Sequence, residues 1–228
     1  MKDILNVAYG SISAQMLDIY LPAGDVSSVF VYFHGGGLES GDKKSAAIFA
    51  PYLTEMGIAV ISANYRMYPG YEYPDFICDA ASAVAFSVEY AEKELGCKTV
   101  YVGGSSAGGY LSMMLCFDER WLAPYGMTTT DVDGWVHDAG QPTAHFNVLK
   151  FSGVDSRRVI VDESTPLYHI GTQERHSPMR FIVSDNDMEN RYEQTMLMLA
   201  ALKNYGHSNF DSVIMHGKHC EYTETFHE

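Results

Sequence analysis

The stretch TVYVGGSSAGG, residues 99–109, decides the fold that this sequence predicts. Residues 99–102 are β-branched or aromatic, which is typical of a buried strand. Four small residues follow at 103–106, and residues 107–117 then have the composition of a helix. Because a strand joined to a helix is the repeating unit of α/β proteins, this stretch predicts one such unit.

Similar units extend from this stretch toward both ends of the 228-residue chain. The expected strands are residues 16–21, 29–33, 58–63, 99–102, 180–183 and 212–215, and the expected helices are residues 46–56, 75–95, 107–117 and 192–205. Residues 118–170 are less regular and hold a candidate strand at 132–136. Strands that alternate with helices of this length predict a mostly parallel sheet with helices on both faces. We therefore expect a single α/β domain over residues 1–228.

Composition excludes several classes of partner. The net charge is −14 with only 15 basic residues, which argues against nucleic acid and against anionic membrane surfaces. No apolar run has the length of a membrane span. The first residues contain no hydrophobic signal segment, so a cytoplasmic location is expected. The four cysteines are spaced too widely for a metal knuckle or a CxxC motif, and we expect them to be buried thiols: Cys78, Cys97, Cys116 and Cys220.

Ser106 lies on the expected turn between strand and helix, in the frame Gly104-x-Ser106-x-Gly108. A serine on such a turn adopts a strained backbone that exposes its hydroxyl group, and the small residues two positions away prevent clashes. The N-terminus of the following helix favours developing negative charge. Ser106 is therefore the candidate nucleophile. Ser105 competes with it, but the frame of Ser105 ends at Ala107 and lacks the second glycine.

Two later strand ends carry the groups that a serine nucleophile needs. SDND, residues 184–187, and HGKH, residues 216–219, each follow an expected strand. In open α/β sheets the working residues lie at the carboxyl ends of strands. A carboxylate there can orient a histidine, and the histidine can take the serine proton. The residues alone leave two candidate acids and two candidate bases: Asp185 and Asp187, His216 and His219.

A glycine-rich segment, HGGG at residues 34–37, follows the expected buried strand at 29–33. Glycines let the backbone bend and approach a ligand closely. The N–H groups of such a loop can stabilise an oxyanion in a pocket that excludes water. Four residues of the irregular stretch are either further pocket residues or ordinary loop residues: His137, Asp138, Gln141 and His145.

HGGG at 34–37 and GSSAGG at 104–109 together resemble motifs of the esterase and lipase branch of the α/β-hydrolases. That branch contains hormone-sensitive-lipase-like esterases, acetyl esterases and acetylxylan or feruloyl esterases. Further segments are similar to it: LDIYLP at 17–22, NYRMYP at 64–69, YP at 73–74 and TPLY at 165–168. The resemblance covers nearly the whole chain and implies an α/β-hydrolase fold. The residues before His34 read as strands, so we expect no large cap domain.

The resemblance assigns roles to six residues of this chain. Its nucleophile, acid and base are Ser106, Asp187 and His219. Its oxyanion donors are the backbone N–H groups of Gly36, Gly37 and Ala107. The chain departs from the branch at Ser105, where the branch usually has aspartate. It also departs at Ser184-Asp185, where Gly-Glu is frequent, and at Cys220-Glu221, where glycine or an aromatic residue is common.

The implied activity is that of a serine carboxylesterase, which hydrolyses a small or carbohydrate-linked ester through an acyl-enzyme. The expected partner is this small-molecule ester, and no metal or organic cofactor is needed. One alternative is an amidase such as an arylformamidase, although that group has aromatic residues after its HGG motif and this chain has Leu38. Another is a non-catalytic binding protein, although such proteins usually lose a triad member. No sequence feature specifies the acyl chain, the alcohol or the oligomeric state.

Overall fold

The computed structural model of the protein describes residues 2–223 and contains one eight-stranded sheet. The strands are β1 (Lys2–Ala8), β2 (Met16–Leu21), β3 (Ser28–Phe33), β4 (Ile58–Ala63), β5 (Val100–Ser105), β6 (Gly134–Asp138), β7 (Met179–Ser184) and β8 (Phe210–Met215). Their order in the sheet is β1-β2-β4-β3-β5-β6-β7-β8. β2 pairs antiparallel with β1 and β4, and the pairs from β4 across to β8 are parallel. The predicted mostly parallel sheet is therefore confirmed.

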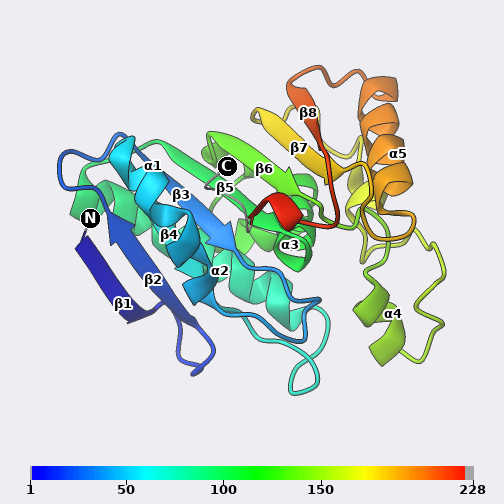
Figure 1. The fold of residues 1–228 in the computed structure, drawn as a ribbon, viewed down its shortest axis with the longest axis horizontal. Coiled ribbons are helices and arrows are strands. Elements are labelled where there is room, and N and C mark those ends of the chain that lie inside the picture. The colour runs from blue at the N-terminus through cyan, green and yellow to red at the C-terminus, as the bar shows by residue number, and fades with distance from the viewer. Residues whose placement is uncertain (1, 224–228) are drawn as a thin grey trace.

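Helices cover both faces of this sheet (Figure 1). The α-helices of the described residues are α1 (Ala50–Glu55), α2 (Asp75–Leu95), α3 (Ala107–Phe117), α4 (Phe146–Phe151) and α5 (Arg191–Asn204). Alternate residues of β3 point to opposite faces: Phe33 belongs to the core beneath α2, α3 and α5, whereas Tyr32 packs with Ala50 of α1. Helix α1 therefore covers one face, and α2, α3 and α5 cover the other.

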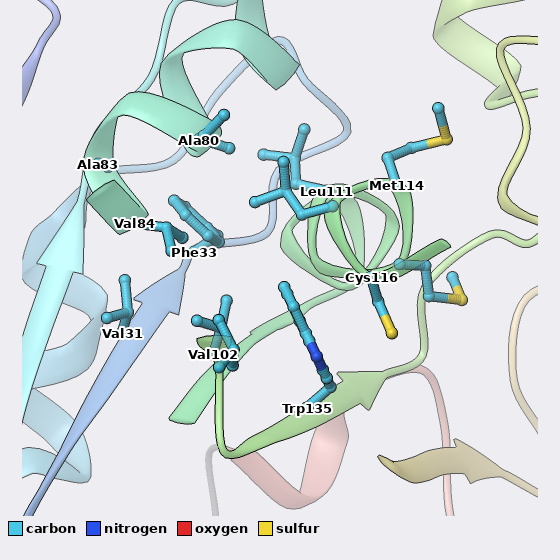
Figure 2. Packing of buried hydrophobic residues seen from close by; sticks show 14 of the residues in the cluster. Val31, Phe33, Ala80, Ala83, Val84, Val102, Leu111, Met114, Cys116 and Trp135 are labelled. Atoms are coloured by element: carbon cyan, nitrogen blue, oxygen red, sulfur yellow. The ribbon is translucent and has the colours of Figure 1, made fainter. Parts of the chain in front are cut away.

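The larger core lies between the sheet and helices α2 and α3. Figure 2 shows Phe33 of β3 and Val102 of β5 pointing toward Val84 of α2 and Leu111 of α3. All four side chains are buried, and burial of each contributes about 1.5–3 kcal/mol. This packing fixes β3 and β5, and therefore the starting points of the loops that follow them.

Parallel pairing brings the carboxyl ends of several strands together at the same end of the sheet. Phe33 at the end of β3 lies opposite Gly104 of β5, and Ser184 at the end of β7 lies opposite Met215 of β8. The segments after these four strands are the ones in which the sequence places its candidate residues. β8 is one of the two outermost strands of the sheet, and its residues 211–214 are exposed.

Several element boundaries differ from the prediction by a few residues, and two of the differences have a clear physical reason. The segment predicted as one helix over 46–56 is a 3-10 turn (Lys43–Ile48) followed by the short helix α1. Pro51 lacks an N–H group and fits only the first turn of a helix, so α1 begins at Ala50. β5 continues through Gly103 and Gly104, where a side chain would lie 2.7 Å from the Val136 oxygen and 2.6 Å from the Phe33 oxygen, respectively.

No helix within residues 2–223 combines the length and apolar character that crossing a bilayer requires.

Candidate active site

Ser106 occupies a sharp turn between β5 and α3. Its backbone has φ 56° and ψ −113°, a conformation that is strained for a residue with a side chain. The Ser106 N–H donates a hydrogen bond to the carbonyl oxygen of Asp138 at 2.8 Å. A Cβ atom at Gly108 would lie 1.9 Å from the Phe33 carbonyl oxygen, so only glycine fits there. The turn thus depends on the small residues that flank Ser106.

His219 joins the end of β8 to this turn through its imidazole ring. Its Nε2 atom lies 2.8 Å from Ser106 Oγ, and its Nδ1 atom lies 2.5 Å from Asp187 Oδ1. Asp187 comes from the segment after β7 and its side chain is fully buried. The structure therefore brings the predicted nucleophile, base and acid into one hydrogen-bonded chain.

Several donors surround the Asp187 carboxylate. Burial alone raises the pKa of this group, but the hydrogen bond and charge of His219 outweigh burial, together with the N–H groups of Met188 and Ser184. The net result is a pKa below the usual aspartate value. Asp187 is thus held as an anion that accepts the Nδ1 proton of His219.

Asp185 and His216 form a separate pair on the surface. His216 Nδ1 lies 2.5 Å from Asp185 Oδ2, and their side chains are 95% and 42% exposed. Asp185 also accepts the N–H of Gly217 at 3.0 Å. The pair therefore ties the segment after β8 to the segment after β7 instead of contacting Ser106.

The Ser105 hydroxyl group is hydrogen-bonded to Asp138 and not to His219. Its Oγ donates to the Asp138 carboxylate at 2.6 Å, and the Tyr222 hydroxyl donates to the other oxygen of the same carboxylate. The sequence proposed Asp138 only as a possible pocket residue, and it gave no role to Tyr222. The only sequence signal for Tyr222 is its position three residues after His219.

The glycine-rich loop passes beside Ser106. Gly36 and Gly37 have φ values of 112° and 65°, which favour glycine, and a Cβ atom at Gly36 would lie 2.1 Å from the Ser40 carbonyl oxygen. A Cβ atom at Gly35 would lie 3.3 Å from Ser106 Cβ. His34, the first residue of the loop, is held by Tyr65. The two rings stack, and the Tyr65 hydroxyl donates to the His34 carbonyl oxygen at 2.8 Å.

The loop is also held from the side of α4. Asn147 Nδ2 donates to the Gly37 carbonyl oxygen at 2.5 Å and to Glu39 Oε2 at 2.7 Å. Glu39 forms an ion pair with Lys150 of the same helix at 2.8 Å. No motif in the sequence indicates these contacts, because they join residues more than a hundred positions apart.

A cavity of about 1040 Å³ opens beside Ser106. It is lined by Ser106, His219, Gly35 and Gly36, and by apolar side chains from the sheet, from the 3-10 turn and the residue after it, and from α1: Phe30, Tyr32, Ile48, Phe49, Leu53, Val136 and Ile182. Gly37 is turned toward Asn147. Ala107 is the first residue of α3, so its N–H group has no acceptor within the helix.

The four residues proposed from the irregular stretch separate into two groups. Asp138 lines the cavity. His137 is buried among aromatic rings, His145 caps α4 through its Nδ1 atom, and Gln141 Nε2 donates to the Ala144 carbonyl oxygen at 2.8 Å. These three support the surrounding chain. Within residues 2–223, no three His, Cys, Asp or Glu side chains are grouped as a metal site.

Comparison with known proteins identifies the family. The model of the BD-FAE family matches residues 17–130, which is half of the chain and includes both the HGGG and the GSSAGG segments. The chain belongs to the BD-FAE family. This membership confirms the resemblance to the esterase and lipase branch of the α/β-hydrolases.

Curated relatives of this BD-FAE chain include the carboxylic ester hydrolase LipN of Mycobacterium tuberculosis, which is 35% identical over 121 residues. That match covers 51% of this chain and 32% of LipN. A kynurenine formamidase of Danio rerio is 26% identical over 116 residues, with 50% of this chain and 39% of that protein covered. The chain thus spans about a third of the length of the curated relatives that it matches.

Solved structures share the fold of this BD-FAE chain. Esterase B from Lactobacillus rhamnosis superposes with a TM-score of 0.80 at 18% identity, covering 100% of this chain and 80% of that one. A truncated carbohydrate esterase from gut microbiota gives 0.76 at 20% identity, with 99% and 95% covered.

Proposed function

We propose that the protein is a serine carboxylesterase in which Ser106, His219 and Asp187 form the catalytic triad. One observation carries the proposal: His219 is hydrogen-bonded through Nε2 to Ser106 Oγ at 2.8 Å and through Nδ1 to Asp187 at 2.5 Å. This is the geometry in which a histidine removes a serine proton while a carboxylate orients the ring.

Hydrolysis begins with attack of Ser106 Oγ on the ester carbonyl carbon. His219 Nε2 takes the serine proton as the new bond forms, and the Asp187 anion stabilises the resulting imidazolium. The negative charge that develops on the carbonyl oxygen is received by backbone N–H groups, for which we propose Gly36, Gly37 and Ala107. Loss of one such donor typically costs about 3 kcal/mol of transition-state stabilisation.

The tetrahedral intermediate then collapses to an acyl-enzyme. His219 gives its proton to the leaving alcohol, and the acyl group stays on Ser106. A water molecule, deprotonated in turn by His219, attacks the acyl carbon. The bond from this carbon to Ser106 Oγ then breaks, His219 returns its proton to Ser106 Oγ, and the acid is released. The cavity beside Ser106 supplies the space for the ester, and its apolar walls suit a neutral small-molecule substrate.

The choice of acid is tested by a matched pair of variants. Asp187→Asn should lower kcat for p-nitrophenyl acetate by about 10⁴-fold, because asparagine leaves the imidazole without its anionic partner. Asp185→Asn should leave kcat near the wild-type value, because Asp185 pairs with an exposed histidine, and exposed pairs contribute little. Steady-state rates of both variants at pH 7 give the answer. The reverse result, with only Asp185→Asn inactive, makes Asp185 the acid.

A second candidate is amide hydrolysis of an arylformamide. It is favoured by the kynurenine formamidases among the relatives, which are 26% and 28% identical over half of this chain. The same triad performs both reactions, since they differ only in the leaving group. Parallel measurement of kcat/KM for p-nitrophenyl acetate and N-formylkynurenine separates them: a higher value for the formamide would replace the esterase assignment.

A further inference from the structure

Asp138 contacts the Ser106 turn in two ways. It is the last residue of β6, and its carbonyl oxygen accepts the Ser106 N–H at 2.8 Å. Its carboxylate accepts the hydroxyl of Ser105 at 2.6 Å. The side chain is buried, with 6% of the residue exposed. Asp138 therefore binds both the side chain of Ser105 and the backbone of Ser106.

The same carboxylate also reaches the segment that carries His219. Tyr222 lies in a 3-10 turn (Glu221–Thr223) and donates its hydroxyl to Asp138 Oδ1, while Ser105 occupies Oδ2. The earlier part of this segment has different anchors, because Ser184 Oγ donates to the Lys218 carbonyl oxygen at 2.8 Å. The segment is thus held on both sides of His219 in the sequence, at Lys218 before it and at Tyr222 after it.

We propose that Asp138 is a positioning residue that sets the separation between Ser106 and His219, by tying the nucleophile turn and the base-bearing segment to one carboxylate. The inference rests on the proposed function, because it assumes that these two groups react with each other. The geometry supports it directly: each carboxylate oxygen binds one of the two segments that must stay in register.

The two oxygen atoms of the Asp138 carboxylate fit this role. Burial outweighs the hydrogen bonds from Ser105 and Tyr222, so the pKa of its carboxyl group lies above the usual aspartate value. Both hydroxyl groups donate, so the arrangement needs two acceptor oxygens. Asparagine has one acceptor oxygen and one donor NH₂ group. Asp138→Asn therefore keeps the volume of the side chain but removes the anionic acceptor, and one of the two hydroxyl groups must turn to accept from the NH₂ group, which weakens and displaces that contact.

The experiment compares Asp138→Asn with two variants that each remove one tie, Ser105→Ala and Tyr222→Phe. We measure kcat and KM for p-nitrophenyl acetate, and the rate at which a fluorophosphonate labels Ser106. A displacement of about 1 Å between reacting groups costs up to about 10²-fold in rate, so kcat and the labelling rate should fall by about 10- to 100-fold in Asp138→Asn. KM should stay close to the wild-type value. Tyr222→Phe combined with Asp138→Asn should lower kcat by less than the product of their separate effects, because both changes act on the same contact.

Asp79→Asn is the matched control. Asp79 of α2 is also a buried carboxylate. It forms an ion pair with Arg66 at 2.7 Å and does not line the cavity. Its replacement should lower the melting temperature without changing kcat of the folded protein. The inference is wrong if Ser105→Ala and Tyr222→Phe, which leave the carboxylate in place, both keep wild-type kcat and labelling rates. A wild-type protein that neither hydrolyses the ester nor reacts with the fluorophosphonate overturns the proposed function itself. An active wild type whose variants have unchanged rates overturns only the positioning role of Asp138.

Discussion

Ser106→Ala should lower kcat for p-nitrophenyl acetate by about 10⁴- to 10⁶-fold, which is the range lost when a triad nucleophile is removed. The Ser106 hydroxyl is the group to which His219 Nε2 is hydrogen-bonded, and no acyl-enzyme can form without it. Alanine keeps a Cβ atom at the strained φ of 56°, so the cost of the turn is the same in both proteins. The melting temperature should therefore change little.

Ser105→Ala provides the comparison for this result. Ser105 is hydrogen-bonded to Asp138 and not to His219, so its loss should cost far less activity than the loss of Ser106. Peptide mapping of the fluorophosphonate adduct should find the label on Ser106. Full activity in Ser106→Ala together with an inactive Ser105→Ala would show that the nucleophile is the other serine.

Acid should destabilise the folded protein through two buried histidines. Burial, reinforced by nearby His176 and Arg191 respectively, lowers the pKa of His137 and of His145 to about 3. The unfolded chain takes up these protons below a pH of about 6.5, whereas the folded protein does not. Because the unfolded state then binds more protons, the free energy of unfolding falls as the pH drops from about 6.5 toward about 3. At pH 4 the two groups together remove about 7 kcal/mol, a large part of the 5–15 kcal/mol typical of a domain.

The contribution of each histidine is measured from the slope of unfolding free energy against pH. His137→Asn and His145→Asn should each reduce this slope between pH 6 and pH 4 by about 1.4 kcal/mol per pH unit, which corresponds to one proton. Urea titrations of each variant at pH 8, where both states are neutral at these positions, give the packing loss separately. Slopes equal to the wild-type slope would show that these imidazoles are protonated in the folded protein.

The sequence predicts most of the sheet because its strands are short apolar runs bounded by glycine or polar residues. The same logic brings Ser106, Asp187 and His219 together, since parallel strands end at one edge. Local patterns do not distinguish Asp187 from Asp185. That distinction depends on which carboxylate is buried, and burial is set by tertiary packing.

Contacts between distant segments are the part that sequence reasoning misses. Asn147 binds Gly37 across 110 positions, and Tyr222 binds Asp138 across 84. Asn147 and Tyr222 belong to no periodic pattern or short motif, so no local signal reports either contact. The short helix α4 is missed for a related reason, because six residues are too few to show a helical period.

The exposed position of β8, the strand that precedes His219, affects how the protein loses its activity on heating. β8 is one of the two outermost strands, four of its residues face solvent, and His219 follows it by four positions. Few buried apolar contacts hold such a strand, so it opens locally at a lower free energy than the core strands β3 and β5. We therefore expect thermal inactivation to precede global melting, and the amide protons of β8 to exchange with solvent before those of the sheet centre.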